Sequence, residues 1–83
     1  MDADEWYVYV VRCADQSFYT GIAKDVEARV SKHNSRSGAK YTRTRTPVTL
    51  VYHEACADQG AALRREYEIK QMPAADKRRL AGE

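Results

Sequence analysis

The first strong feature of the chain is an apolar run over residues 6–13 that is rich in valine and tyrosine. Residues of these types favour a pleated, largely buried strand over a helix. Turn-forming residues follow at 14–17, and residues 18–22 have the composition of a second short strand. Together they predict an antiparallel hairpin, against which the remaining elements must pack.

Beyond the hairpin, the sequence predicts one more strand and three helices. A strand over residues 48–54 follows Pro47. The predicted helices cover residues 24–34, about 58–72 and 74–81, with Asp58 as the N-cap of the second, and the only long loop spans residues 35–46. The pattern predicts an α/β (α+β) fold in which helices flank a small three-stranded antiparallel sheet.

Length and composition bear on the number of domains and on the compartment. With 83 residues and 43% hydrophobic content, we expect one domain over residues 1–83, with its core at 6–72. No stretch longer than a short strand is continuously apolar, and the first five residues are acidic where a signal peptide would be basic. We therefore expect a soluble cytoplasmic protein without a membrane segment. Cys13 and Cys56 belong to no metal-ligand motif and are expected to be reduced thiols.

The formal net charge of +2 hides an uneven distribution. No carboxylate occurs between residues 28 and 53, and this stretch contains Arg29, Lys32, Arg36, Lys40, Arg43 and Arg45. A run of one sign attracts polyanions, although a solvated loop kept soluble by its charge would look the same. Tyr41 and three threonines alternate with the cations of residues 40–46. This alternation favours nucleic-acid binding, because hydroxyls and cations both serve phosphate oxygens.

Two tyrosines and a glycine are predicted to share one surface of the hairpin. Side chains alternate across a strand, so Tyr9 lies on one face of the first strand, and Tyr19 and Gly21 share a face of the second. If the register brings these faces together, the tyrosines lie close, and Gly21 leaves a gap that a ligand or another backbone can approach. The alternative is that both tyrosines are ordinary core residues.

Arg29 and His33 lie one helical turn apart, beside a stripe formed by Val26 and Val30. This spacing places both cations at the rim of the core. There an arginine can present its planar fork to a phosphate, and a histidine can exchange protons near neutral pH. Surface arginines and helix-terminal histidines without such roles are common, so each residue alone leaves the assignment open.

Glu66 is the most informative single residue of the chain. Its helical-wheel position lies inside an apolar arc formed by Ala62, Leu63, Tyr67 and Ile69. Burying an unpaired carboxylate is costly, so Glu66 must meet a metal, a cation or water in a cleft. Both a functional site and a structural ion pair, for instance with Arg29, satisfy this requirement.

The order and spacing of these residues resemble the GIY-YIG nuclease family. The pattern consists of Tyr7-Val8-Tyr9, then Tyr19-Thr20-Gly21, then Arg29, His33 and the helical Glu66. The resemblance extends from Trp6 to about Met72, and it is greatest to the small stand-alone members of the UPF0213 type, which include segments like residues 38–42 and 62–66. It implies a small three-stranded antiparallel sheet flanked by helices, and one divalent metal ion.

The resemblance also implies a role for each residue. Tyr9 would help to deprotonate the attacking water, Tyr19 would hydrogen-bond at the scissile phosphate, and Arg29 would bind its non-bridging oxygen. His33 would assist proton transfer or orientation, and Glu66 would hold Mg²⁺ or Mn²⁺. A cation and a metal suit this reaction because they balance the charge that builds on the phosphodiester. The pKa of a free phenol is about 10, so Tyr9 would need Arg29 and the metal to lower its pKa.

Two features depart from the family pattern. Many members carry an asparagine after the metal-binding glutamate, whereas the only asparagine here is Asn34, and no appended DNA-reading domain is visible. These absences point to activity that is weak, structure-selective or dependent on a protein partner. The expected function is a metal-dependent nuclease that acts on DNA, in repair or recombination. The alternatives are a non-catalytic nucleic-acid-binding module that uses the basic loop 36–46, and a protein-interaction domain.

Overall fold

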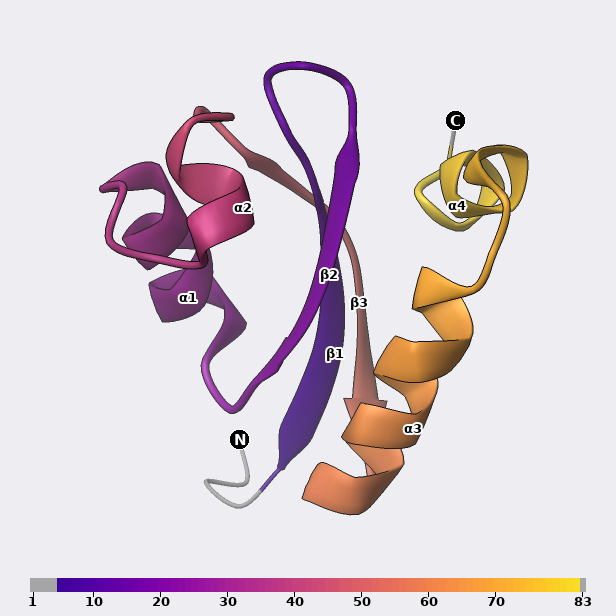
Figure 1. The fold of residues 1–83 in the computed structure, drawn as a ribbon. Helices are drawn as coiled ribbons and strands as arrows, with labels where there is room; N and C mark the ends of the chain where they lie inside the picture. Colours follow the sequence, from indigo (N-terminus) through magenta and orange to yellow (C-terminus); the bar gives the residue numbers. More distant parts are fainter. Residues whose placement is uncertain (1–4, 83) are drawn as a thin grey trace.

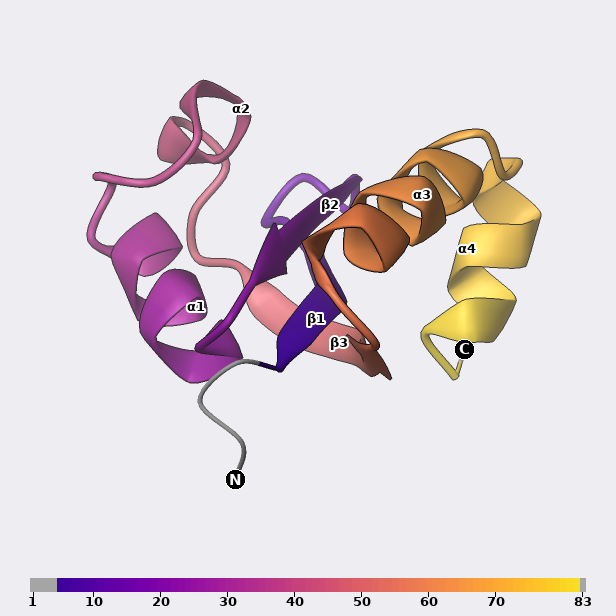
Figure 2. The same cartoon turned by 90° about the horizontal axis from the view of Figure 1, so that it is seen from below.

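The computed structural model describes residues 5–82, so most of the acidic N-terminus lies outside the described residues. Its elements are β1 (Trp6–Arg12), β2 (Phe18–Ala23), α1 (Val26–Asn34), α2 (Lys40–Arg43), β3 (Thr49–Cys56), α3 (Gln59–Lys70) and α4 (Ala74–Leu80). The strands form one antiparallel sheet in the order β2-β1-β3. α1 and α2 cover one face of this sheet, and α3 and α4 cover the other (Figure 1 and Figure 2). The predicted fold class is confirmed.

The register between β1 and β2 decides which side chains meet. Tyr9 lies opposite Gly21, and Val11 lies opposite Tyr19. Tyr9 and Tyr19 are therefore diagonal neighbours on one face, with ring centroids 6.4 Å apart. The predicted hairpin and the predicted proximity of the two tyrosines are confirmed.

Each face of β1 builds its own core, as alternation along a strand predicts. On the α1 side, Tyr9, Val11 and Cys13 are buried, with Val26 and Val30 packed against them. On the other side, Val8 and Val10 are buried with Ile69 of α3, and Cys56 packs against them. Both cysteines are free thiols. The sheet is thus held between two apolar layers.

Aspartates begin the two longest helices. Asp25 Oδ1 accepts a hydrogen bond from Ala28 N–H at 3.0 Å, and Asp58 Oδ1 accepts one from Ala61 N–H at 2.8 Å. A carboxylate in this position satisfies a backbone donor that the first helical turn leaves unpaired. The N-cap at Asp58 agrees with the prediction. α1 begins later than predicted, because Asp25 caps it from outside.

The segment predicted as one loop over residues 35–46 contains the short helix α2. Four residues are too few to produce a detectable periodicity, so this helix was missed. Its Thr42 is fully buried. Both the backbone N–H and the hydroxyl of Thr42 lie within hydrogen-bonding distance of Ala39 O, at 3.1 and 3.0 Å. Thr42 therefore closes the turn and anchors α2 to the body of the protein.

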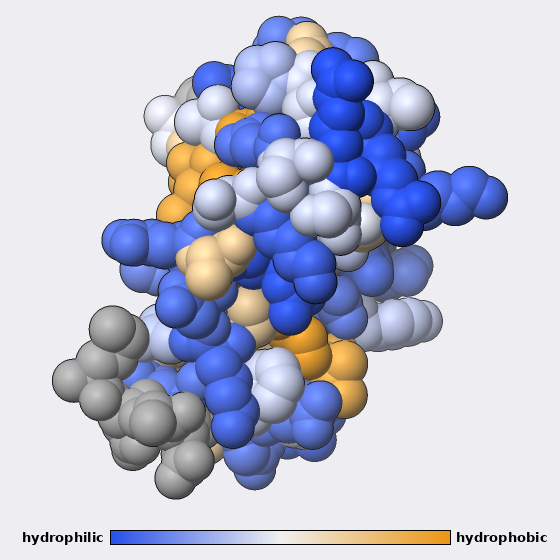
Figure 3. Space-filling model, turned by 90° about the vertical axis from the view of Figure 1, so that its left-hand side faces the viewer, coloured by the Kyte–Doolittle hydropathy of each residue, from blue (hydrophilic) through white to orange (hydrophobic). Residues whose placement is uncertain are grey.

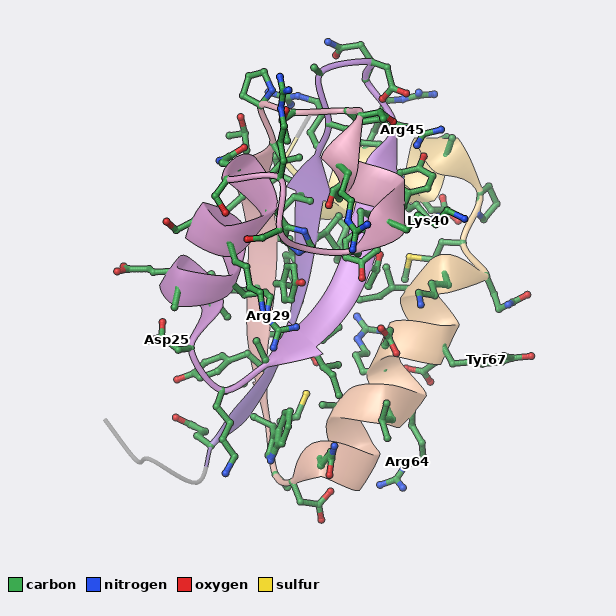
Figure 4. The ribbon with its side chains drawn as sticks, turned by 60° about the vertical axis from the view of Figure 1, so that its left-hand side comes forward. Asp25, Arg29, Lys40, Arg45, Arg64 and Tyr67 are labelled. Atoms are coloured by element: carbon green, nitrogen blue, oxygen red, sulfur yellow. The ribbon has the colours of Figure 1, made fainter. Side chains whose placement is uncertain are left out.

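α3 faces the sheet with a narrower apolar stripe than predicted. Ala62 and Ile69 are fully buried, and Glu66 lies in the same i, i+4, i+7 row with its side chain 19% exposed. Leu63 and Tyr67 are 47% and 67% exposed, and Tyr67 points away from the sheet in Figure 4. Their predicted burial was wrong, because a helical wheel contains no information on the width of the contact with the sheet. The inward position of Glu66 is confirmed.

α4 extends the layer formed by α3. Its Leu80 packs against the core on that side, while Arg78 and Arg79 are exposed. The basic face of this helix is therefore exposed. Among residues 5–82, no helix is long and apolar enough to cross a membrane.

Asn34 joins the end of α1 to the entry of β3, and its removal should destabilise the fold. Its Oδ1 accepts from Val48 N–H at 2.7 Å, and its Nδ2 donates to Val48 O at 3.1 Å. Asn34→Ala leaves both backbone groups unpaired, so we expect the free energy of unfolding to fall by about 1–3 kcal/mol. Asn34→Asp keeps the acceptor but places a carboxylate oxygen against Val48 O, and it should lose at least as much. Urea unfolding measures both variants, and unchanged midpoints would contradict this role.

Candidate active site

A buried hydrogen bond between a phenol and an imidazole lies on the α1 side of the sheet. Tyr9 Oη and His33 Nε2 are 2.8 Å apart, and both residues are 1% exposed. β1 supplies the tyrosine, and the last turn of α1 supplies the histidine. The predicted position of His33 at the rim of the core was wrong. The ring lies inside the core, because both of its nitrogens have partners there.

The second imidazole nitrogen, Nδ1, lies 2.7 Å from Thr42 Oγ1. This partner was not predicted from the sequence, because the threonines of the basic segment were interpreted as phosphate ligands. One signal was available in Gly38, the only glycine of the segment between α1 and β3. A lone glycine in a loop often marks a place where the backbone passes close to another group.

Two glycines make room for the Tyr9–His33 pair. A Cβ atom at Gly21 would lie 2.6 Å from Tyr9 Oη, and one at Gly38 would lie 2.5 Å from His33 Nδ1. Carbon atoms do not approach oxygen or nitrogen so closely without a bond, so any larger residue would displace a ring. The gap predicted beside Gly21 is therefore filled by the Tyr9 phenol itself.

Tyr19 extends the cluster toward the basic segment. Its ring meets His33 edge-on with centroids 5.2 Å apart, and it stacks on the Tyr41 ring at 6.0 Å. The Arg45 guanidinium lies over the Tyr41 ring, 4.0 Å from its centroid. The aromatic contacts thus connect the buried pair to α2 and to the exposed cations around it.

Arg29 and Glu66 complete the cluster from two different helices. Figure 4 shows Arg29 reaching from α1 toward β2. The charge of Arg29 and its hydrogen bonding lower the pKa of Tyr9, whereas the charge of Glu66 raises it. Both groups are therefore within electrostatic reach of the same phenol. Of the residues to which the resemblance assigned catalytic roles, Tyr9, Tyr19 and His33 are in mutual contact, and the charges of Arg29 and Glu66 act on the Tyr9 phenol.

Burial dominates the acid–base properties of the pair. It raises the pKa of Tyr9 to about 12, and Tyr19 adds to this increase while Arg29 opposes it. Burial also lowers the pKa of His33 from its ordinary value of 6.5, and the Arg29 charge lowers it further. At neutral pH the imidazole is therefore neutral and the phenol is protonated. Arg29 alone does not produce the expected lowering of the Tyr9 pKa, because burial outweighs the cation.

Glu66 is the carboxylate of the cluster that is placed to hold a cation. Its Oε2 lies 3.3 Å from Lys70 Nζ, and the Lys70 side chain is 51% exposed. Such a surface pair at i,i+4 is worth about 0.3–0.5 kcal/mol, so Lys70 holds the carboxylate weakly. In the described part of the chain, Glu66 pairs with Lys70 and not with Arg29, and no group of three or more His, Cys, Asp or Glu side chains is arranged to hold a metal.

Exposed cations surround the cluster. Lys32, Arg36, Lys40 and Arg43 are exposed, and the side of the molecule that α1 and α2 cover is largely hydrophilic in Figure 3. Arg45 makes the more extensive contacts, because its Nε donates to Asp15 Oδ2 at 3.0 Å and its Nη1 donates to Tyr41 O at 2.7 Å, whereas Arg43 Nε donates to Gly38 O at 3.3 Å. The structure uses Arg45 to tie the β1–β2 turn to α2, and it leaves the other four side chains at the surface.

The geometry agrees with a comparison against known protein families. The family model of the GIY-YIG catalytic domain matches residues 5–79, which include every residue of the cluster. The chain belongs to the GIY-YIG family. Membership implies nuclease chemistry in general.

Several relatives of this GIY-YIG chain are small proteins of the UPF0213 type. A UPF0213 protein of Staphylococcus aureus strain Mu3 is 55% identical over 80 residues, which cover 96% of this chain and 98% of that protein. The UPF0213 protein DP2720 of Desulfotalea psychrophila is 50% identical over 80 residues, with coverages of 95% and 73%. The solution NMR structure of the UPF0213 protein BH0048 from Bacillus halodurans is 44% identical and has a TM-score of 0.59, with coverages of 94% and 83%. The predicted resemblance is confirmed.

Substitution of Gly21 tests the close contact with Tyr9. In Gly21→Ala the phenol or the strand must shift, so we expect the free energy of unfolding to fall by about 1–3 kcal/mol. Gly60→Ala is the matched control, since a Cβ there meets nothing closer than 3.4 Å. Alanine also suits a helix better than glycine by about 0.5–1 kcal/mol. Urea unfolding compares the two variants, and equal effects would argue against the contact.

The buried phenol should make stability depend on pH in the alkaline range. An unfolded tyrosine loses its proton near pH 10, whereas Tyr9 in the folded protein keeps its proton to about pH 12. In this window the unfolded state binds fewer protons, so stability falls as pH rises, by roughly 2–3 kcal/mol from this residue. Tyr9→Phe should lack this part of the alkaline loss. The measurement is the free energy of unfolding against pH for both proteins, and identical slopes would refute the expectation.

Proposed function

We propose that this chain is a divalent-metal-dependent endonuclease that hydrolyses phosphodiester bonds in DNA, prefers particular DNA structures, and serves DNA repair or recombination in the cytoplasm. The observation that carries the proposal is the buried Tyr9–His33 hydrogen bond, with Arg29, Tyr19 and Glu66 around the same phenol. Family membership supports nuclease chemistry. Metal dependence, DNA as the substrate and a role in repair or recombination are the parts of the proposal that go beyond this general activity.

In the proposed reaction, substrate binding opens the buried Tyr9 phenol to a water molecule beside the phosphorus, and this water gives up a proton as it attacks. Neutral His33 takes the Tyr9 proton on Nε2 while the phenol oxygen takes a proton from the water, and the water oxygen bonds to phosphorus. The phosphorus–oxygen bond to the leaving nucleoside breaks, and the leaving oxygen takes a proton from solvent. Arg29 pairs with a non-bridging oxygen and balances the charge that develops there. Tyr19 donates a hydrogen bond to the same phosphate.

Glu66 is the proposed metal ligand, and its surroundings fit this role. Mg²⁺ keeps several waters and takes one or two protein carboxylates, so one glutamate suffices. The Lys70 ammonium at 3.3 Å shows that a cation can approach Glu66 Oε2. A bound Mg²⁺ or Mn²⁺ would supply a Lewis acid for a phosphate oxygen. Its remaining ligands would be water and substrate oxygens.

The exposed cations support a nucleic-acid substrate. Lys32, Arg36, Lys40 and Arg43 extend from the α1 and α2 side, and Tyr41 and Arg45 complete the proposed binding surface. Contacts to phosphates position a nucleic acid but do not read its sequence. We therefore propose that the protein recognises strand structure, and that a protein partner adds specificity. The choice of DNA over RNA follows the family analogy.

A second candidate is a non-catalytic nucleic-acid-binding module that uses the basic residues 36–46. The exposed side chains of Arg36, Lys40 and Arg43 favour it, because they would attract a polyanion without any metal. Its binding would weaken steeply with salt, and metal would not alter it. Such a module has no need of a carboxylate that faces inward, so the position of Glu66 favours the enzyme.

Cleavage assays on branched, flapped and single-stranded DNA with Mg²⁺ or Mn²⁺ test the proposed activity. We expect cleavage that falls by about 100-fold or more in Tyr9→Phe and in Glu66→Gln. Tyr52→Phe is the matched control, because Tyr52 lies on β3 and donates to Glu54 Oε1. It should cleave like the wild type.

Three other outcomes would contradict parts of this proposal. Salt-dependent binding without cleavage, across all substrates and both metals, identifies the binding module. The absence of salt-dependent affinity for DNA and RNA identifies a protein-interaction domain. Full metal-dependent cleavage by Glu66→Gln removes Glu66 as the metal ligand.

A further inference from the structure

We propose that Thr42 is a positioning residue whose hydroxyl fixes His33 in the tautomer that leaves Nε2 free to accept the proton of Tyr9. The tautomer follows from hydrogen bonds among buried groups. Its consequence for catalysis rests on the proposed nuclease function.

The Thr42 hydroxyl has one proton and two polar neighbours. Its Oγ1 lies 3.0 Å from Ala39 O and 2.7 Å from His33 Nδ1. A carbonyl oxygen only accepts, so a hydroxyl proton directed at Ala39 leaves the hydroxyl oxygen to accept from Nδ1–H. The carbonyl has two lone pairs, and it takes this bond in addition to the one from Thr42 N–H at 3.1 Å.

The Tyr9 end of the same chain of hydrogen bonds favours the same direction. When Nδ1 carries the proton of the neutral imidazole, Nε2 has a free lone pair, and Tyr9 donates its O–H to it across 2.8 Å. In the opposite tautomer Nε2–H points at the phenol oxygen, and the phenol proton has no acceptor among residues 5–82. Tyr9 is 1% exposed, so water does not replace the lost partner. An unsatisfied buried hydroxyl is costly, and the bonds therefore run from Tyr9 to His33 to Thr42 to Ala39.

His33 carries a single ring proton at neutral pH. Burial and the Arg29 charge keep its pKa below the ordinary value. A neutral imidazole has one N–H and one acceptor nitrogen, so fixing the proton on Nδ1 also fixes the acceptor at Nε2.

The segment between α1 and α2 is built to hold the hydroxyl against the ring. At Gly38 the backbone passes so close to the imidazole that a Cβ atom would lie 2.5 Å from Nδ1 and 3.0 Å from His33 Cα. Ala39 follows and supplies the carbonyl, and Thr42 lies one turn later on α2. Gly38, the Ala39 carbonyl and the Thr42 hydroxyl thus lie within five residues of one another. Together they fix the surroundings of His33 Nδ1.

The tautomer decides whether His33 can take part in the proposed reaction. A ring protonated on Nε2 would donate to the phenol oxygen and could not accept the Tyr9 proton. In the tautomer that Thr42 selects, the Tyr9 O–H bond breaks and an Nε2–H bond forms. The imidazolium then keeps its Nδ1–H bond to the threonine oxygen, which stabilises the charge on the ring.

NMR of protein labelled with ¹⁵N in its two histidines reads the tautomer directly. Long-range ¹H–¹⁵N correlations distinguish a protonated ring nitrogen from an unprotonated one, and the exposed His53 serves as a reference in each sample. We expect Nδ1–H for His33 in the wild type and in Thr42→Ser, which keeps the hydroxyl. Thr42→Val has the same shape without the hydroxyl, so each tautomer leaves one buried donor unpaired, and there we expect the Nε2–H form to appear beside the Nδ1–H form.

Either of two NMR results would overturn the proposal. One is a wild-type His33 in the Nε2–H form, and the other is an unchanged Nδ1–H tautomer in Thr42→Val. If the valine variant does not fold, Thr42→Ala provides the same comparison, with Thr42→Ser again as the control.

Cleavage kinetics test the positioning role separately. We expect Thr42→Val to lower kcat by about 10- to 100-fold with little change in KM, and Thr42→Ser to stay within about threefold of the wild type. A normal kcat in a valine variant whose tautomer has changed would overturn this role. The expected tautomers in a protein that cleaves no DNA would support the assignment of Thr42 and refute the nuclease function.

Discussion

The hydrogen bond between Tyr9 and His33 is the interaction on which the rest of the structure depends. It joins the central strand to α1 inside the core, where neither ring is open to water. In such surroundings a polar pair is stable only when every donor and acceptor has a partner. Gly21 and Gly38 provide the space, and Thr42 provides the remaining partner. β2 and the segment that leads into α2 therefore both pass close to this one buried pair.

Burial also determines how readily this pair can react. It moves the two pKa values apart, to about 12 for Tyr9 and to below 6.5 for His33. Moving a proton from the phenol to the imidazole is then uphill. The charge of Arg29 lowers the pKa of the phenol, but it also lowers the pKa of the imidazole. The protein therefore does not ionise the pair on its own.

Features that depend on local pattern could be predicted from the sequence, and those that depend on distant partners could not. Strand alternation and the hairpin predicted the face that Tyr9 occupies, and the helical row predicted that Glu66 faces inward. The burial of His33 was missed, because its ring enters the core only where Thr42, nine residues later, bonds to Nδ1. Arg45 was grouped with the phosphate-binding cations on charge alone. Its partner Asp15 lies 30 residues away in a turn, and no local periodicity connects the two.

Glu66 reaches the cluster from the opposite layer, and an edge strand makes this arrangement feasible. α3 covers the face of the sheet opposite α1, and β2 lies at the edge of the sheet (Figure 1 and Figure 2). At Gly21 this strand has no side chain, and the Tyr9 phenol occupies the space beside it. The charge of Glu66 therefore acts on the phenol although the two residues belong to different layers. Both layers keep an apolar core, while the carboxylate of one layer and the guanidinium of the other both act on the Tyr9 phenol.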